Sequence, residues 1–89
     1  MMVVRAVVIA NKNGLHARPA AAIVKLASGF GSQITLTRDD LEVNGKSIMG
    51  VMMLAAECGA TVILRATGDD ASELVDALES LIKDRFGEA

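Results

Sequence analysis

The chain passes from a strand-like run to a helix-like run at Asn13-Gly14-Leu15-His16-Ala17-Arg18-Pro19-Ala20, which contains its only histidine. Asn13 and Gly14 are turn-forming residues, and Pro19 suits a first helical turn because no intrahelical donor is needed there. A helix that begins here offers unpaired backbone N–H groups and the positive end of its dipole to an anion. This segment therefore predicts a strand, a turn and a helix, with His16 at the helix start.

Two roles are open for His16. The imidazole is able to take a phosphoryl group whose negative charge the helix start would solvate, and Arg18 adds forked donors for phosphate oxygens. The alternative is a surface histidine that acts as a weak helix cap. One histidine and one arginine form a common pair, so the residues of this segment alone leave both roles open.

Outward from this segment, hydrophobic periodicity predicts four strands and three helices. Residues 3–10 are rich in β-branched side chains, and residues 33–38 alternate between apolar and polar side chains. The helical segments carry apolar residues at three- and four-residue steps. We expect strands at 3–10, 33–38, 41–43 and 60–67, and helices at 17–28, 47–57 and between 70 and 86.

Small polar residues mark the helix starts. Ser47 is the expected N-cap of the second helix, and Asp70 with Glu73 forms a plausible capping box at the start of the third. The order β-α-β-β-α-β-α has connections too short for long crossovers, which predicts an antiparallel or mixed sheet with helices on one face. We therefore expect an α+β fold, a two-layer sandwich in a single domain over residues 1–89.

The composition argues against several classes of function. A net charge of −2, with scattered basic residues, argues against nucleic acid as the main partner. One cysteine and one histidine do not make a dedicated zinc site, and no metal or cofactor motif is present. The apolar context of Cys58 predicts a buried thiol that acts as a small hydrophobe. Without a signal peptide or a run of roughly 20 apolar residues, the chain is expected to be cytoplasmic and not to insert into a membrane.

The segment 47–57 is largely apolar, and its first half is apolar nearly all round. A small domain with two longer amphipathic helices has little room to bury it completely, so we expect Val51, Leu54 and Ala55 to face the sheet. The opposite side would then expose a patch suited to several partners, because methionine side chains repack easily. This expected patch consists of Ile48, Met49 and Met52. The alternative is ordinary core packing, and Ser47 beside it is either a helix cap alone or also a phosphorylation site.

Two motifs stand out, one at Gly14-Leu15-His16-Ala17-Arg18-Pro19-Ala20 and one at Asn44-Gly45-Lys46-Ser47-Ile48-Met49-Gly50-Val51-Met52. Together they resemble the active-site motif and the regulatory-serine motif of the HPr family, the histidine phosphocarriers of the bacterial phosphotransferase system. The resemblance covers essentially the whole chain. It implies an open-faced β-sandwich whose four-stranded antiparallel sheet has the order 1-4-2-3, with three helices on one face.

The resemblance also implies a role for each site residue. His16 would accept a phosphoryl group at Nδ1 from phosphorylated enzyme I and pass it to a histidine of an enzyme IIA component. Arg18 would steady the phosphate, and Leu15 would belong to the docking surface. Ser47 would be the target of an HPr kinase/phosphorylase, whose action lowers acceptance at His16. The rest of the docking surface would be formed by Ile48, Met49 and Met52.

A phosphocarrier of this kind is a shuttled substrate of partner enzymes and not itself an enzyme, and it needs no cofactor of its own. We expect a monomer. The alternative function is a regulatory binding module that acts through Ser47 and the exposed patch on partners such as transcriptional regulators, including those of the nitrogen branch. The serine motif does not decide between the sugar branch and the nitrogen branch.

Overall fold

The computed structural model describes residues 1–88 and contains the expected strands and helices in the expected order, followed by a short 3-10 helix. The strands are β1 (Met2–Val8), β2 (Gln33–Arg38), β3 (Leu41–Asn44) and β4 (Thr61–Thr67). The helices are α1 (Ala17–Ala27), α2 (Ile48–Met53), α3 (Ala71–Lys83) and the 3-10 helix η1 (Arg85–Gly87). No helix within residues 1–88 is both long and apolar enough to cross a membrane.

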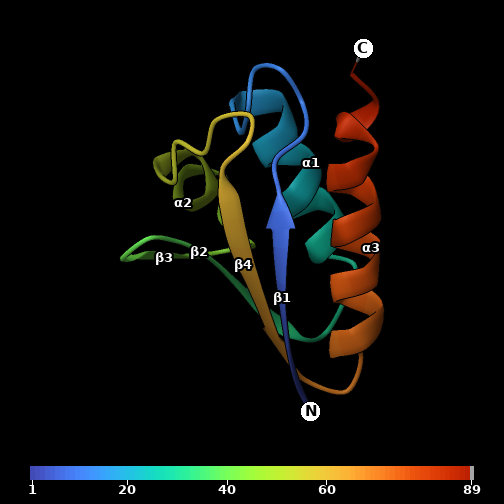
Figure 1. Cartoon of the computed structure of the whole chain (residues 1–89). Helices are drawn as coiled ribbons and strands as arrows, with labels where there is room; N and C mark the ends of the chain where they lie inside the picture. The colour runs from blue at the N-terminus through green and yellow to red at the C-terminus, as the bar shows by residue number, and fades with distance from the viewer. Residues whose placement is uncertain (89) are drawn as a thin grey trace.

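The four strands form one antiparallel sheet in the order β1-β4-β2-β3. Figure 1 shows α1 and α3 stacked against one face of this sheet, while the opposite face is left open. The fold is therefore an open-faced α+β sandwich, which confirms the expected class and the strand order implied by the resemblance. A two-residue turn at Asp39-Asp40 closes the β2–β3 hairpin, and Asp39 has the positive φ (52°) that such tight turns favour.

The hydrophobic core lies between the sheet and the helices. Along β4, Val62, Leu64 and Ala66 are buried while the side chains between them point to the open face, as expected of a sheet covered on one side. Helices α1 and α3 each bury one apolar face against the sheet, formed by residues spaced three and four positions apart. Their fully buried apolar residues are Ala20, Ile23, Ala27, Ala71, Leu74, Val75, Leu78 and Ile82.

Helix α2 is shorter than the expected segment 47–57. The side chain of Arg38 donates hydrogen bonds to the carbonyl oxygens of Leu54 (3.2 Å) and Ala55 (2.7 Å). Ala55 also has a left-handed φ of 49°, a conformation typical of residues that follow a helix end. These carbonyl groups are satisfied by a side chain from β2 and not by further helical turns. The chain therefore leaves the helix after Met53.

The early end of α2 corrects two further expectations. Val51 and Leu54 are buried as expected, whereas Ala55 is exposed because it lies beyond the helix. Cys58 is exposed in the turn before β4, so the expectation of a buried thiol is wrong. Its apolar sequence neighbours suggested a helix that does not extend as far as this residue.

The capping box expected at the start of α3 does not form. Asp70 is the N-cap residue, but its side chain makes no cap hydrogen bond to α3. Its carboxylate instead accepts hydrogen bonds from the N–H groups of Gly31 and Ser32 and from the Ser32 hydroxyl. The Ser32 hydroxyl is the largest of the causes that hold the pKa of the Asp70 carboxyl below its ordinary value of 3.8. Asp70 thus ties the loop before β2 to the start of α3.

We expect acid to destabilise the fold partly through Asp70. A carboxyl with a lowered folded-state pKa stabilises the fold above its unfolded pKa and loses that contribution as the pH falls through the folded pKa. The free energy of unfolding, measured by urea denaturation, should therefore fall with pH below about 4. The fall should be shallower in Ser32→Ala, which lacks the strongest donor to Asp70. Equal slopes in the two proteins would contradict this assignment.

Candidate functional site

His16 is the N-cap residue of α1. Its backbone is extended, with φ of −80° and ψ of −169°, and its carbonyl oxygen accepts the Ala20 N–H at 3.0 Å. Its imidazole makes no cap hydrogen bond to α1, so the structure does not support the alternative role of a weak side-chain cap. With 38% of its side chain exposed, the ring is accessible to another protein at the positive end of the helix dipole.

The start of α1 leaves two backbone donors beside this ring. Pro19 has no N–H, and the N–H of Ala20 is already bonded to His16. The N–H groups of Ala17 and Arg18 therefore have no acceptor within the helix. Arg18 is exposed on the same turn. An anion carried by the ring would thus lie near two N–H groups and the positive end of the helix dipole, with the Arg18 cation on the same helical turn.

The segment between α2 and β4 holds the loop before His16. The N–H of Leu15 donates to the carbonyl oxygen of Ala56 at 2.9 Å, and Gly14 lies against the same carbonyl. Gly14 has a left-handed φ of +69°, and a Cβ at this position would overlap the Ala56 oxygen and lie 2.9 Å from Cα of Glu57. Glycine is therefore needed here both for its backbone conformation and for the close approach.

Leu15 lies in the hydrophobic core and not on the surface. Only 4% of the residue is exposed, and it belongs to the core cluster between the sheet and the helices. Full burial of a leucine stabilises a fold by roughly 1.5–3 kcal/mol. A side chain this buried has almost no contact area to offer a partner, which corrects the expectation that Leu15 forms part of the docking surface. Its position instead anchors the loop that carries His16.

Two site residues were not identified by sequence reasoning. Nε2 of His16 lies 3.2 Å from Oε2 of Glu88, and Nδ2 of Asn11 donates to Oε1 of the same carboxylate at 3.1 Å. Asn11 is fully buried and also donates to the carbonyl oxygen of Gly14 at 2.8 Å. The only local signal in the sequence was an asparagine directly after the first strand, which is equally typical of a turn. Nothing in the sequence around Glu88 connects it with a histidine 72 positions away.

Ser47 is the N-cap residue of α2, as expected. Its hydroxyl oxygen accepts the Gly50 N–H at 3.1 Å, and its own N–H donates to the carbonyl oxygen of Asn44. The residue is half-buried and therefore partly accessible from solvent. The geometry confirms the cap, and a role as a phosphorylation site stays a prediction.

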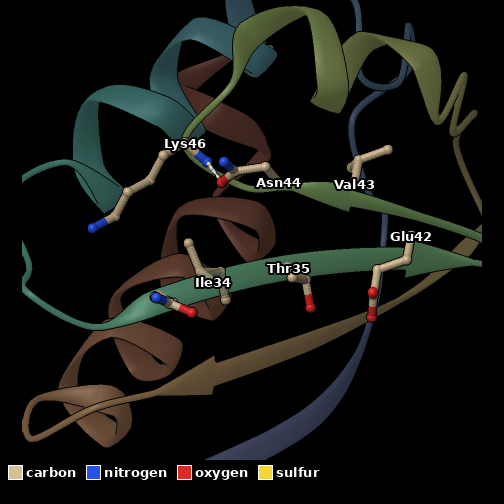
Figure 2. A pocket seen from close by; sticks show the side chains of 7 residues that line it. Ile34, Thr35, Glu42, Val43, Asn44 and Lys46 are labelled. Carbon is tan, nitrogen blue, oxygen red and sulfur yellow. Dashed lines mark hydrogen bonds between the residues drawn. The ribbon is translucent and has the colours of Figure 1, made fainter.

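The turn that leads to Ser47 borders a hollow on the β2–β3 hairpin, which Figure 2 shows from close by. In this turn the Asn44 side chain accepts the N–H of Lys46 at 2.9 Å, and Nζ of Lys46 donates to the carbonyl oxygen of Phe30. Both side chains are therefore already engaged in holding the chain. The residues that line the hollow are Gln33, Ile34, Thr35, Glu42, Val43, Asn44 and Lys46. Neither His16, Arg18 nor Ser47 lines the hollow, so it is separate from both sites that the sequence singles out.

Helix α2 exposes the three residues that the sequence singles out, together with a fourth. Met49 is the most exposed of them, at 75%. The exposed apolar side chains of this helix, here called the α2 patch, are Ile48, Met49, Met52 and Met53. The expected patch left out Met53, although it lies four residues after Met49 and therefore on the same side of the helix. The role of the patch in docking stays a prediction.

The α2 patch, His16 and Glu88 lie in one region of the molecule. Helix α2 packs against α1. Figure 1 shows the loop before α1, the helix α2 and the C-terminal end of α3 towards the same end of the molecule. A partner that covers His16 is therefore able to contact α2 as well. Within residues 1–88, no group of three or more His, Cys, Asp or Glu side chains is placed to hold a metal ion.

Comparisons with known proteins agree with this geometry. The family model for the PTS HPr component phosphorylation site matches residues 3–84. The phosphocarrier protein HPr of Cupriavidus necator is 52% identical over 87 residues, which cover 98% of each chain. The phosphocarrier protein HPr of Treponema pallidum is 49% identical over 87 residues, which cover 98% of this chain and 99% of the relative.

A solved structure of the same kind is also close in fold. The crystal structure of HPr-C-His from Thermoanaerobacter tengcongensis superposes with a TM-score of 0.94 at 49% identity, covering 98% of both chains. The match extends over the sheet, the helices and the loop that carries His16. The chain therefore belongs to the HPr family, the phosphocarriers of the bacterial phosphotransferase system.

Proposed function

We propose that His16 accepts a phosphoryl group at Nδ1 from phosphorylated enzyme I and passes it to a histidine of an enzyme IIA component in the cytoplasm. The observation that carries this proposal is the exposed imidazole at the N-cap of α1. Nε2 faces the Glu88 carboxylate, which leaves Nδ1 as the ring nitrogen available to a donor. On this proposal the protein is a shuttled substrate of its partners and not an enzyme.

The transfer needs only the lone pair of Nδ1 and a phosphoryl donor. The lone pair attacks phosphorus, the new N–P bond forms as the donor's bond to phosphorus breaks, and the donor leaves with the bonding electron pair. The proton on Nε2 stays in place throughout. The reverse set of bond changes hands the phosphoryl group to the enzyme IIA histidine, and Nδ1 regains its lone pair.

The exposure of the site supports a carrier that releases its cargo. The N–H groups of Ala17 and Arg18, the helix dipole and the Arg18 guanidinium are able to orient the phosphoryl oxygens from one side. Because the ring is partly open to solvent, these groups do not enclose the phosphate. A phosphoryl group held in this way is stabilised enough to persist and remains accessible to the next acceptor.

The proposal is tested by incubating the protein with phosphoenolpyruvate and a catalytic amount of enzyme I. We expect one acid-labile phosphoryl group per chain, and nitrogen and phosphorus NMR should place it on Nδ1 of His16. Addition of an enzyme IIA component should then discharge it. Failure to label, or labelling of a different residue, would contradict the proposed function.

We also propose that Ser47 regulates this loading by phosphorylation and that the α2 patch contributes to partner docking. Ser47 stands at the start of α2, directly before the exposed Ile48 and Met49. Added negative charge is tolerated by a helix N-terminus but would repel an acidic partner surface next to the patch. A dedicated HPr kinase/phosphorylase is the expected enzyme for this modification.

Substitution Ser47→Asp is expected to slow enzyme I-dependent loading of His16 by about tenfold or more, because a charge mismatch at an interface lowers the association rate. Ser47→Ala is the matched control. It loses the cap bond to Gly50 and about 1 kcal/mol of stability, but it should load at nearly the native rate. Initial rates of radiolabel transfer measure both effects, and equal rates for the two variants would contradict the regulatory role.

A second candidate function is a regulatory binding module, which the exposure of the α2 patch favours. Such a module would bind a transcriptional regulator, in the sugar branch or the nitrogen branch, without needing transfer from His16. In that case His16→Ala would retain regulator binding while Ser47→Asp would lose it. Titration calorimetry with a candidate regulator separates this function from the carrier function.

A further inference from the structure

We infer that Glu88 is a positioning residue, whose carboxylate holds the His16 ring with its proton on Nε2 and its lone pair on Nδ1. The inference rests on the proposed function of His16 and assigns a role to the chain end. A carboxylate is an acceptor only, so the ring nitrogen 3.2 Å from Oε2 must act as the donor. The opposite nitrogen then has no proton and is the nucleophile.

The carboxylate is itself held from a second direction. Its other oxygen, Oε1, accepts a hydrogen bond from Nδ2 of Asn11 at 3.1 Å. Asn11 is fully buried, and its second Nδ2 hydrogen is directed to the carbonyl oxygen of Gly14 at 2.8 Å. With 22% of its side chain exposed, Glu88 is less accessible than the ring it contacts. Hydrogen bonds thus connect Asn11 to Glu88 and Glu88 to His16. Because Asn11 is fixed in the loop, they restrict the orientation of the imidazole.

The backbone after α3 is shaped to bring Glu88 to this position. Arg85, Phe86 and Gly87 follow one another with left-handed φ values of 57°, 55° and 74°. A left-handed residue is common after a helix end, but each non-glycine residue in this conformation costs free energy, so two in succession persist only with support from the surrounding structure. Phe86 packs against the hydrophobic core and so anchors the turn. Glu88 therefore follows an ordered turn that Phe86 holds against the core.

The position of Glu88 also suits the phosphorylated ring. Once Nδ1 carries the phosphoryl group, the ring retains its proton on Nε2 and gains positive character. The Glu88 carboxylate faces that side of the ring and balances the positive character without touching the phosphoryl group. No proton has to move before the next transfer, because the Nε2 proton stays where it is.

The test compares the native protein with Glu88→Ala and Glu88→Gln, and uses Glu73→Ala as the control for a lost carboxylate at an exposed position on α3. Nitrogen NMR of the neutral imidazole reports which ring nitrogen carries the proton. The native protein and Glu73→Ala should show Nε2–H only, whereas Glu88→Ala should show a mixture with Nδ1–H. Initial rates of loading by enzyme I should fall by about three- to tenfold in Glu88→Ala, the loss expected for one hydrogen bond.

Glu88→Gln separates positioning from a general effect of the chain end. Its amide has one acceptor oxygen and one NH2 donor, so when the oxygen accepts the Asn11 N–H the NH2 group faces Nε2 of His16 and donates to it. We therefore expect Glu88→Gln to show Nδ1–H at least as much as Glu88→Ala does, and to load no faster than that variant. Identical ring spectra and loading rates in all four proteins would overturn the role of Glu88. Failure of the native protein to load would contradict the proposed function of His16, while the ring spectra would still test the role of Glu88.

Discussion

Substitution His16→Ala is expected to abolish phosphoryl acceptance from enzyme I while leaving the fold intact. His16 is the only histidine of the chain, so no second imidazole is available as nucleophile. Loss of a nucleophile typically removes at least about a thousandfold of the transfer rate. The ring is partly exposed and makes no cap bond, so the variant loses only the bond to Glu88, and the free energy of unfolding should fall by no more than about 1.5 kcal/mol.

The measurement follows acid-labile radiolabel from phosphoenolpyruvate, with urea unfolding of the same samples as the check on the fold. Ser28→Ala is a matched control, since Ser28 is exposed at the opposite end of α1. That variant should load at the native rate. Acid-labile phosphate on His16→Ala would place the acceptor on another residue and refute the proposed site.

Substitution Gly14→Ala is expected to lower the free energy of unfolding by about 2–4 kcal/mol. Alanine is strained by roughly 1–2 kcal/mol at the left-handed φ of Gly14. The new Cβ would also overlap the carbonyl oxygen of Ala56, which accepts the Leu15 N–H and cannot retreat without losing that bond. The loop that carries His16 should therefore shift, and phosphoryl acceptance should fall together with stability.

Gly59→Ala separates the two causes of this loss. Gly59 also has a positive φ, +93°, but a Cβ there would meet nothing within 4 Å. The free energy of unfolding of Gly59→Ala should fall only by the cost of backbone strain, about 1–2 kcal/mol. This variant should load at nearly the native rate. Urea unfolding curves measure both variants. Equal losses in Gly14→Ala and Gly59→Ala would show that the contact with Ala56 contributes nothing.

Much of the architecture was predictable because it depends on local patterns. The alternation along residues 33–38 and the three- and four-residue steps in α1 and α3 survive in the structure, since each element has one face on the core. Strand boundaries agree within two residues. The order of the strands in the sheet was not contained in these patterns and came from the resemblance.

The errors have a common physical origin in partners from distant parts of the chain. The length of α2 was overestimated because Arg38, from β2, takes over the carbonyl groups of Leu54 and Ala55. Asp70 has the sequence of a helix cap, but its carboxylate accepts hydrogen bonds from Gly31 and Ser32 in the loop before β2. Local rules describe what a residue is able to do, and the packing of remote segments decides which option it takes.

The sequence by itself determined the order of strands and helices, the position of His16 at a helix start, and the cap at Ser47. Each of these depends on neighbours within a few positions. Only the tertiary structure decided that Leu15 is core, that Gly14 lies against the Ala56 carbonyl, and that Glu88 faces the His16 ring. The reason is that these contacts join segments up to 72 positions apart, and no local pattern encodes a pairing at that separation.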